Sequence, residues 1–282
     1  MEIINGKKVE YVLSLSYGKD SMACLGAIKH LGWPLHRIVT ADIWATDNIR
    51  ADYPPMAAFK DYADKVIKER YGIEVEHYHA TTIDGVVKDK VTYRDGFYHT
   101  MQSGKHEGTI KGFPMMRGPW CQKLKLNAVE QMPTEADVVI QYLGIAADEP
   151  DRIAKHIDRP NTMLPLVALG WEEDLCGLWC KYSDLLAPTY TSSTRDGCWF
   201  CHNQRTDQLR NLRHAHPELW QLLLEWDKDS PVTFKAPTRK QAGHTVRDYD
   251  ERFKLEDDGV LIKDDSRFRW KQLNEPIQLS LF

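Results

Sequence analysis

Hydrophobic and polar residues alternate from residue 9 to residue 15, which is the pattern of a β-strand. Apolar residues then recur at helical spacing over residues 22–31. The same two patterns next predict a strand, a helix and a strand, over residues 37–43, 54–70 and 73–79. Strands that alternate with helices in this order imply right-handed crossovers. We therefore expect an α/β fold with a doubly wound, mostly parallel sheet.

The second half of the chain has fewer clear periods. Residues 137–143 are nearly continuous in apolar residues, as expected of a buried parallel strand. Residues 122–130 and 217–226 have helical patterns. Residues 228–271 show little pattern beyond a hairpin around Asp257-Asp258-Gly259.

A long segment over residues 81–119 interrupts the strand–helix rhythm. It is rich in glycine and has a mild basic bias with aromatic residues interleaved. A loop of this length inside a compact domain predicts either a lid or substrate-binding flap, or a solvated surface excursion. We expect an α/β nucleotide-binding domain over residues 1–170 that contains this loop. A mainly helical, cysteine-containing region follows over residues 171–277, and residues 278–282 form a flexible tail.

Composition narrows the class of protein. The chain has 282 residues, of which 42% are hydrophobic, enough for one large core or for a core with a smaller appended region. The net charge of −4 does not demand nucleic acid. No apolar run has the length of a transmembrane helix, and the N-terminus lacks a signal peptide. We therefore expect a cytoplasmic protein, whose six cysteines are thiols or metal ligands.

The candidate chemistry begins where the first strand meets the first helix, at residues 16–21, Ser-Tyr-Gly-Lys-Asp-Ser. Free backbone N–H groups and the positive end of the helix dipole converge there, which makes an anion site. Gly18 permits close approach of a phosphate, and Lys19 adds a positive charge. Asp20 can hold Mg²⁺ through its carboxylate. The alternative is an ordinary strand–turn–helix with a polar N-cap.

These six residues resemble the SxGKDS pyrophosphate loop (PP-loop) of the ATP pyrophosphatases and of their relatives in the phosphoadenosine-phosphosulfate (PAPS) reductase family. The segment Gly144–Arg152 resembles the one that follows a strand in that family, although Ala146 and Pro150 replace an Arg and a Ser. The resemblance implies catalytic roles for Lys19, Asp20 and Arg152. It also implies that ATP is held by Ser14, Ser16, Tyr17, Gly18, Lys19, Asp20, Ser21, Asp42, Gly144, Asp148 and Arg152. The alternative for Arg152 is a surface ion pair with Asp148 or Asp151.

The cysteines suggest a metal centre. Cys198-x-x-Cys201 alone is compatible with zinc, an iron–sulfur cluster or a redox pair. The resemblance favours a [4Fe–4S] cluster over Zn²⁺, with Cys121, Cys180, Cys198 and Cys201 as ligands and Cys176 as the alternative fourth ligand. Cys24 lies within the first helix and is expected to be a small core residue.

The reaction implied by the resemblance is cleavage of ATP to AMP and pyrophosphate, coupled to iron–sulfur-dependent sulfur or redox chemistry. One alternative is a PAPS or adenylyl sulfate reductase. Such reductases generally have a degenerate PP-loop and need a C-terminal nucleophilic cysteine, whereas Lys19-Asp20 is intact and no cysteine follows Cys201. A second alternative is a nucleotide-sensing adaptor without turnover.

Two further features concern partners. The last five residues resemble the bacterial sliding-clamp-binding peptide, with Gln278, Leu279, Leu281 and Phe282 as contacts. The alternative is a tail that folds back onto the protein. If the peptide resemblance holds, DNA phosphorothioation proteins are the nearest analogy, with nucleic acid as the substrate. Arg205, Arg210 and Arg213 predict either a nucleic-acid contact or a solvated helix face.

Overall fold

The computed structural model describes residues 1–114, 118–192, 197–237 and 242–273. The chain forms two compact units. The first comprises Met1–Tyr93 and Gln122–Asp196, and the second comprises Arg94–Cys121 and the chain from Gly197 onward. This division differs from the expected one. Residues 171–192 belong to the α/β unit, and residues 94–121 belong to the cysteine-containing unit.

The first unit is built on a sheet of six strands in which β4, β3, β2, β7 and β8 lie in that order. All neighbouring pairs in this series are parallel, and β1 alone pairs antiparallel with β2. The strands are β1 (Glu2–Ile4), β2 (Lys7–Ser14), β3 (Arg37–Asp42), β4 (Val75–His79), β7 (Val138–Tyr142) and β8 (Thr162–Met163). The α/β class with a mostly parallel sheet is thus confirmed. The carboxyl ends of β2, β3, β4 and β7 meet at one edge, where open α/β sheets bind ligands.

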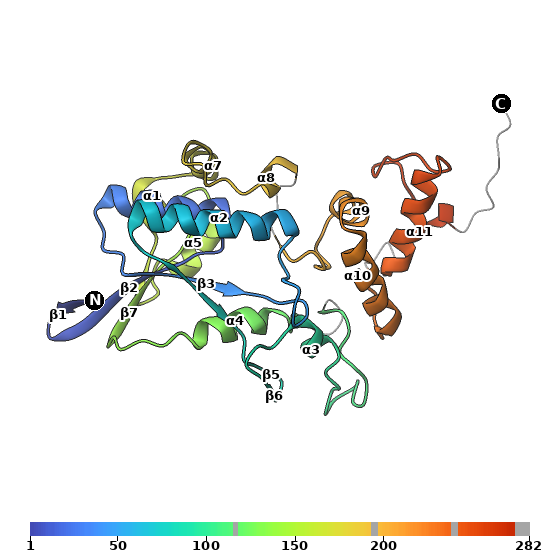
Figure 1. Cartoon of the computed structure of the whole chain (residues 1–282), viewed down its shortest axis with the longest axis horizontal. Coiled ribbons are helices and arrows are strands. Elements are labelled where there is room, and N and C mark those ends of the chain that lie inside the picture. Colours follow the sequence, from blue (N-terminus) through green and yellow to red (C-terminus); the bar gives the residue numbers. More distant parts are fainter. Residues whose placement is uncertain (115–117, 193–196, 238–241, 274–282) are drawn as a thin grey trace. The chain divides into compact units, whose positions relative to one another are not determined.

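Helices cover both faces of this sheet. The helices α1 (Lys19–Leu31) and α2 (Pro54–Tyr71) lie on one face, and α4 (Gln122–Glu130) lies on the other (Figure 1). Both α1 and α2 end at a glycine with positive φ, as the sequence predicts for Gly72. The remaining helices of this unit are α5 (Pro150–His156), α6 (Pro165–Leu169), α7 (Glu173–Tyr182) and α8 (Thr189–Ser192).

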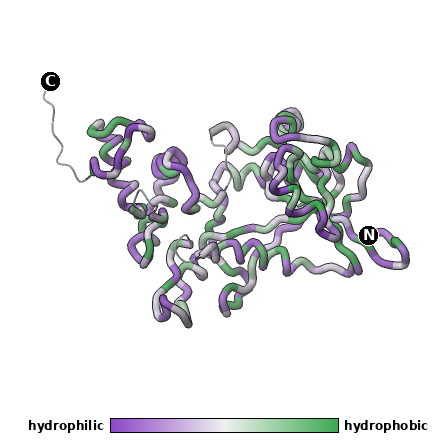
Figure 2. The backbone as a smooth tube through the Cα atoms, turned by 180° about the vertical axis from the view of Figure 1, so that it is seen from behind, coloured by the Kyte–Doolittle hydropathy of each residue, from purple (hydrophilic) through white to green (hydrophobic). Residues whose placement is uncertain are grey.

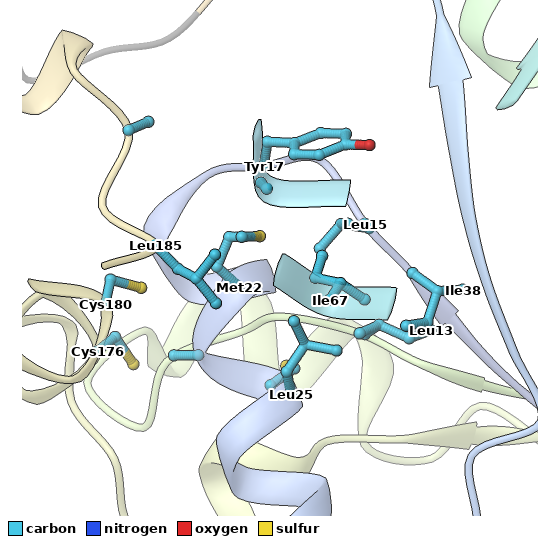
Figure 3. Packing of buried hydrophobic residues seen from close by; sticks show 14 of the residues in the cluster. Leu13, Leu15, Tyr17, Met22, Leu25, Ile38, Ile67, Cys176, Cys180 and Leu185 are labelled. Atoms are coloured by element: carbon cyan, nitrogen blue, oxygen red, sulfur yellow. The ribbon is translucent and has the colours of Figure 1, made fainter. Parts of the chain in front are cut away.

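The core of the first unit lies between the sheet, α1, α2 and α7. Figure 3 shows Leu13 and Ile38 from the sheet packed towards Met22 and Leu25 of α1. Helix α7 packs closely on α1. A Cβ atom at Gly26 would lie only 2.3 Å from the Trp179 ring, so the contact requires a glycine at this position. The first half of α1 is therefore buried, and its N-terminus is held rigidly at the sheet edge.

The second unit has an aromatic core between three helices, α9 (Thr206–Ala215), α10 (Pro217–Asp229) and α11 (Val246–Asp257). Trp226 of α10 stacks on Trp199 at 5.5 Å and on Phe97 at 5.9 Å. Phe97 and Phe113 come from the long segment 81–119 and are fully buried. That segment therefore contributes to the core at Phe97 and over residues 111–114, whereas residues 102–105 are exposed. Its N-terminal part forms the hairpin β5 (Thr82–Ile83) and β6 (Val86–Val87), and α3 (Tyr93–Phe97) follows.

One sequence expectation in this unit is wrong, and another holds only in part. The predicted hairpin around residues 257–259 is the end of helix α11, which begins with a capping box between Thr245 and Asp248. Of the three arginines expected on a solvated or nucleic-acid-binding face, Arg205 is exposed and pairs with Asp207, whereas Arg210 and Arg213 are paired within the unit. Arg210 Nε lies 2.7 Å from Glu256 Oε2, and Arg213 Nε lies 2.9 Å from Asp250 Oδ1. Both guanidinium groups are thus engaged within the unit.

Hydrophobic stretches alternate with hydrophilic ones along both units (Figure 2). Among the helices of the described residues, none is both long enough and apolar enough to span a bilayer. The clamp-like tail, residues 278–282, lies outside the described residues, and its partner stays a prediction.

Candidate active site

The segment that connects β2 to α1 folds back on the first turn of the helix. The backbone N–H of Ser16 donates to Ser21 Oγ at 3.1 Å, and the two serine hydroxyls lie 3.0 Å apart. Ser21 Oγ in turn donates to the carbonyl oxygen of Gly18 at 3.0 Å. The two serines therefore shape the loop itself. Ser14, at the end of β2, precedes this loop and pairs with Val39 of β3 in the sheet register.

The loop presents the N-terminus of α1 at the carboxyl edge of the sheet. Gly18 is the N-cap and supplies no side-chain hydrogen bond. The first N–H of the helix, that of Lys19, donates to the hydroxyl oxygen of Tyr190 in α8 at 3.0 Å. A helix of 13 residues with this start has the backbone donors and the dipole that an anion needs.

Lys19 is held between two carboxylates. Its Nζ lies 2.8 Å from Asp20 Oδ1 and 2.8 Å from Glu173 Oε2. Burial lowers the pKa of Lys19, but the hydrogen bonds to Asp20 and Glu173 outweigh it and raise the pKa above its usual value. An ammonium has three donors, and two of them point at these carboxylates. The third can be directed at a phosphate oxygen.

Asp20 lies in an acidic environment despite its lysine partner. Burial, together with the nearby charges of Glu173 and Glu149, raises the pKa of the Asp20 carboxyl, and the Lys19 ammonium only partly offsets this. A phosphate on the loop would add more negative charge. A cation in addition to Lys19 would relieve that repulsion, and Mg²⁺ on Asp20, expected from the sequence, would have this role.

Gly144, which follows β7, lies against the backbone of the loop. A Cβ atom at this position would lie 2.6 Å from the backbone nitrogen of Ser21 and 2.7 Å from its Cα. The role of Gly144 is therefore close approach. Only a residue without a side chain lets the end of β7 contact the first turn of α1.

Tyr17 turns away from the helix N-terminus into the core. It has a φ of 60° and is fully buried, and its hydroxyl donates to Asp64 Oδ1 of α2 at 2.6 Å. Burial and the bond to Asp64 raise the pKa of Tyr17, so its phenol stays neutral and can donate. A left-handed conformation is unfavourable for tyrosine. The buried ring and the hydrogen bond therefore hold the loop in this shape.

Asp42, expected to contact the nucleotide, is itself buried and belongs to the same polar network. Its Oδ2 lies 2.9 Å from His77 Nδ1, and its Oδ1 lies 3.4 Å from Lys60 Nζ. His77 Nε2 lies 3.1 Å from Asp64 Oδ2, so the imidazole bridges two carboxylates. The hydrogen bonds to Asp42 and Asp64 raise the pKa of His77 to about 9. The described side-chain contacts of Asp42 are thus internal.

Asp148 and Arg152 are also paired within the first unit. Asp148 Oδ1 accepts the backbone N–H of Glu173 at 3.1 Å, at the start of α7. The Arg152 guanidinium lies 2.6 Å from Glu149 Oε1 and is half-exposed. Its partner is therefore neither of the two acids considered from the sequence. Arg152 would have to leave Glu149 in order to clamp a phosphate.

A cavity of about 460 Å³ lies beside the lysine of the loop. Its walls come from the start of α1, one side of α7, and the segment that includes α8. The lining residues are Lys19, Asp174, Gly177, Leu178, Lys181, Leu186 and Tyr190. The cavity combines two ammonium groups and one carboxylate, that of Asp174, with apolar and aromatic walls. It can therefore take a group that is both polar and partly apolar.

The cysteines are divided between the two units. Cys176 and Cys180 of α7 are fully buried, and Figure 3 shows them in the core near Met22 and Leu185. Burial raises the pKa of each thiol to about 12. Cys180 Sγ donates to the carbonyl oxygen of Lys19 at 3.2 Å. The environment of both cysteines is that of small core residues.

Cys121, Cys198 and Cys201 belong to the second unit and are half-buried. The Cys198–Cys201 pair lies on a tight turn, where the N–H of Cys201 donates to the Cys198 carbonyl at 3.0 Å. The N–H of Asn203 points at Cys201 Sγ at 3.5 Å, which suits a thiolate. In the described parts of the chain, no group of three or more His, Cys, Asp or Glu side chains is placed to hold a metal ion. A cluster or zinc ion on these cysteines stays a prediction.

Several residues of the site were not found from the sequence. Tyr190 and Glu173 lie far along the chain from the loop, and no local pattern links them to it. The polar network around Tyr17 had a weak signal in the sequence. Lys60 and Asp64 are four residues apart on α2, and Lys60 shares its buried face with Met56. A lysine at a core position of a helix predicts a buried partner.

No protein-family model matches the chain, and no curated protein matches it by sequence. Among solved structures, the U34-tRNA thiolase NcsA from Methanococcus maripaludis with its [4Fe-4S] cluster is similar at 15% identity, with a TM-score of 0.34. The alignment covers 87% of this chain and 81% of that one. A similarity of this size leaves the function to be argued from the chain's own residues.

The contact at Gly144 gives a first prediction. Gly144→Ala should displace the first turn of α1 and destabilise the fold by about 1–3 kcal/mol. Gly197→Ala is the control, because a Cβ atom there meets nothing closer than 3.9 Å. Urea unfolding measures the loss of stability. A Gly144→Ala variant as stable as Gly197→Ala would contradict the close packing of the loop on β7.

His77 gives a prediction about pH. Its pKa in the folded protein, about 9, lies above the ordinary 6.5. Its contribution to stability is therefore complete below pH 6.5 and is lost as the pH rises through 9. Urea unfolding should show wild type more stable than His77→Gln by on the order of 2 kcal/mol at pH 6, with the gap closing by pH 10. His30→Gln, at an exposed position, should show no such change. A gap that is independent of pH would contradict a charged His77 between two carboxylates.

Proposed function

We propose that the chain is a PP-loop enzyme that cleaves ATP to AMP and pyrophosphate. The observation that supports this most is the Ser16–Ser21 loop at the end of a central parallel strand. There the N-terminus of α1, the Lys19 ammonium and the Asp20 carboxylate converge. These groups match the needs of a pyrophosphate leaving group, which are backbone donors, a fixed positive charge and a ligand for Mg²⁺.

The proposed reaction breaks the bond between the α-phosphorus of ATP and the oxygen that bridges to the β-phosphorus. An acceptor oxygen or water attacks the α-phosphorus, and the bridging oxygen leaves with the electron pair as part of pyrophosphate. The α1 N-terminus and Lys19 stabilise the charge that develops there. Mg²⁺ would arrive with the nucleotide and use Asp20 as a protein ligand, since Mg²⁺ sites usually combine one or two carboxylates with phosphates and water.

Reduction of a sulfonucleotide is the weaker alternative. That reaction needs a reactive thiolate, whereas Cys176 and Cys180 of α7, which packs on α1, are buried with pKa values of about 12. At neutral pH they are almost entirely protonated. The intact Lys19-Asp20 pair also favours ATP as the substrate.

We further propose that Cys121, Cys198 and Cys201 are thiolate ligands of an iron–sulfur cluster that serves sulfur or redox chemistry on an activated acceptor. The half-buried thiols and the N–H directed at Cys201 Sγ fit thiolate ligands better than buried core cysteines do. Cys180, expected from the resemblance as a fourth ligand, fits a core residue instead. A nucleic acid is the acceptor class that we propose, by the analogy with DNA phosphorothioation proteins.

Lys19 tests the ATP reaction. Lys19→Ala should lower the rate of pyrophosphate release from ATP by at least about a hundredfold, because it removes the charge that faces the leaving group. Lys68→Ala is the matched control, since Lys68 lies on the exposed side of α2 and pairs with Glu74. Circular dichroism spectra of both variants should match the spectrum of the wild type, which checks that they fold. A Lys19→Ala enzyme as fast as the Lys68→Ala enzyme would refute the assignment of the loop.

The cysteines give a separate prediction. Protein purified without oxygen should contain about four irons per chain and absorb broadly near about 400 nm. Cys201→Ser should lose most of the iron, whereas Cys24→Ala, in the buried first helix, should keep it. Metal analysis and absorption spectra measure both. One zinc per chain with no iron would contradict the cluster.

A further inference from the structure

Tyr190 contacts the proposed phosphate site, and its position suggests a role there. Its hydroxyl oxygen accepts the N–H of Lys19 at 3.0 Å. The same oxygen would lie 3.4 Å from a Cβ atom at Gly18, the N-cap of α1. The phenol oxygen of Tyr190 thus lies at the first turn of the helix, where an anion would be bound.

This hydrogen bond competes with a ligand. A backbone N–H has one hydrogen and makes one strong hydrogen bond. The Lys19 N–H is among the donors that a pyrophosphate group on this loop would use, because it is the first N–H of α1. A phosphate oxygen that takes this hydrogen must therefore replace the Tyr190 oxygen.

We propose that the Tyr190 hydroxyl holds the position of a phosphate oxygen in the unliganded protein and is displaced when the nucleotide binds. This inference rests on the proposed function. It adds a residue that regulates the affinity of the same site.

Displacement of the Tyr190 hydroxyl would also affect the cavity beside Lys19. Tyr190 also lines the cavity beside Lys19, together with Leu178, Lys181 and Leu186. Displacement of its hydroxyl therefore changes one wall of that cavity. Phosphate binding on the loop and the shape of the cavity are linked through this side chain, and such a link is reciprocal.

Tyr190→Phe tests the proposal, because it keeps the ring and removes only the competing oxygen. Magnesium pyrophosphate is titrated calorimetrically into wild type, Tyr190→Phe, Tyr182→Phe and Lys19→Ala. Tyr190→Phe should bind about fivefold more tightly, since the ligand no longer replaces a hydrogen bond. Tyr182→Phe is the matched control, because that tyrosine is 84% exposed at the end of α7, and it should bind as wild type does.

The outcomes separate the two claims. If wild type binds pyrophosphate and Lys19→Ala does not, the proposed site holds. Equal or weaker binding by Tyr190→Phe would then overturn the displacement role alone. A hydroxyl that donates to phosphate and a hydroxyl with a merely structural role both predict weaker binding. If wild type binds neither pyrophosphate nor ATP, the proposed function fails, and this inference fails with it.

Discussion

The backbone contact between the end of β7 and the first turn of α1 is the constraint on which the site depends. Gly144 lies so close to Ser21 that a single added carbon would overlap the helix backbone. The contact fixes the N-terminus of α1 between two adjacent parallel strands. Helix α7 packs against the same helix, with Trp179 of α7 in contact with Gly26 of α1. Together these contacts hold the loop donors at the carboxyl edge of the sheet before any ligand arrives.

A polar network, which is buried at Tyr17, Asp42 and Lys60 and open to solvent at His77, supports the loop from the opposite side. Tyr17, Asp64, His77, Asp42 and Lys60 connect the loop to α2, β3 and β4. Ionised groups in a core are costly unless each has a partner. Here each carboxylate faces a cation or a hydroxyl donor. The network therefore stabilises the left-handed conformation of Tyr17. The candidate site thus has two sets of residues, those at the helix N-terminus, such as Lys19 and Asp20, and those of the network, which hold the loop in place.

Much of this arrangement was predictable from the sequence. The spacing of apolar residues and the residues at the ends of each element determine the strands and helices locally. The four central strands and helices α1 and α2 follow from alternation, helical spacing and the glycines at their ends. The loop was found because small residues link a strand to a helix. Helix α11 was missed because two of its buried positions are Arg252 and Glu256, which hide the apolar face. These charged residues pair with each other at 2.7 Å, which only the fold reveals.

Some residues of the candidate site were predictable from local sequence, and others were not. Lys19 and Asp20 were identified from six consecutive residues, whereas Tyr190 and Glu173 reach the loop from more than 150 positions away. Asp42 was correctly placed at the end of a strand, but its partners Lys60 and His77 come from other elements. Contacts between distant segments depend on the packing of α7 and α8, which no local pattern encodes.

The most direct test of this account is product analysis of anaerobically purified protein. One sample receives magnesium ATP, and the other receives PAPS with a thiol reductant. The account predicts AMP and pyrophosphate from ATP, and no sulfite from PAPS. Release of ADP and phosphate, or of sulfite, would contradict it, because the bond broken would then not be the one whose cleavage we propose for the loop, Lys19 and Asp20.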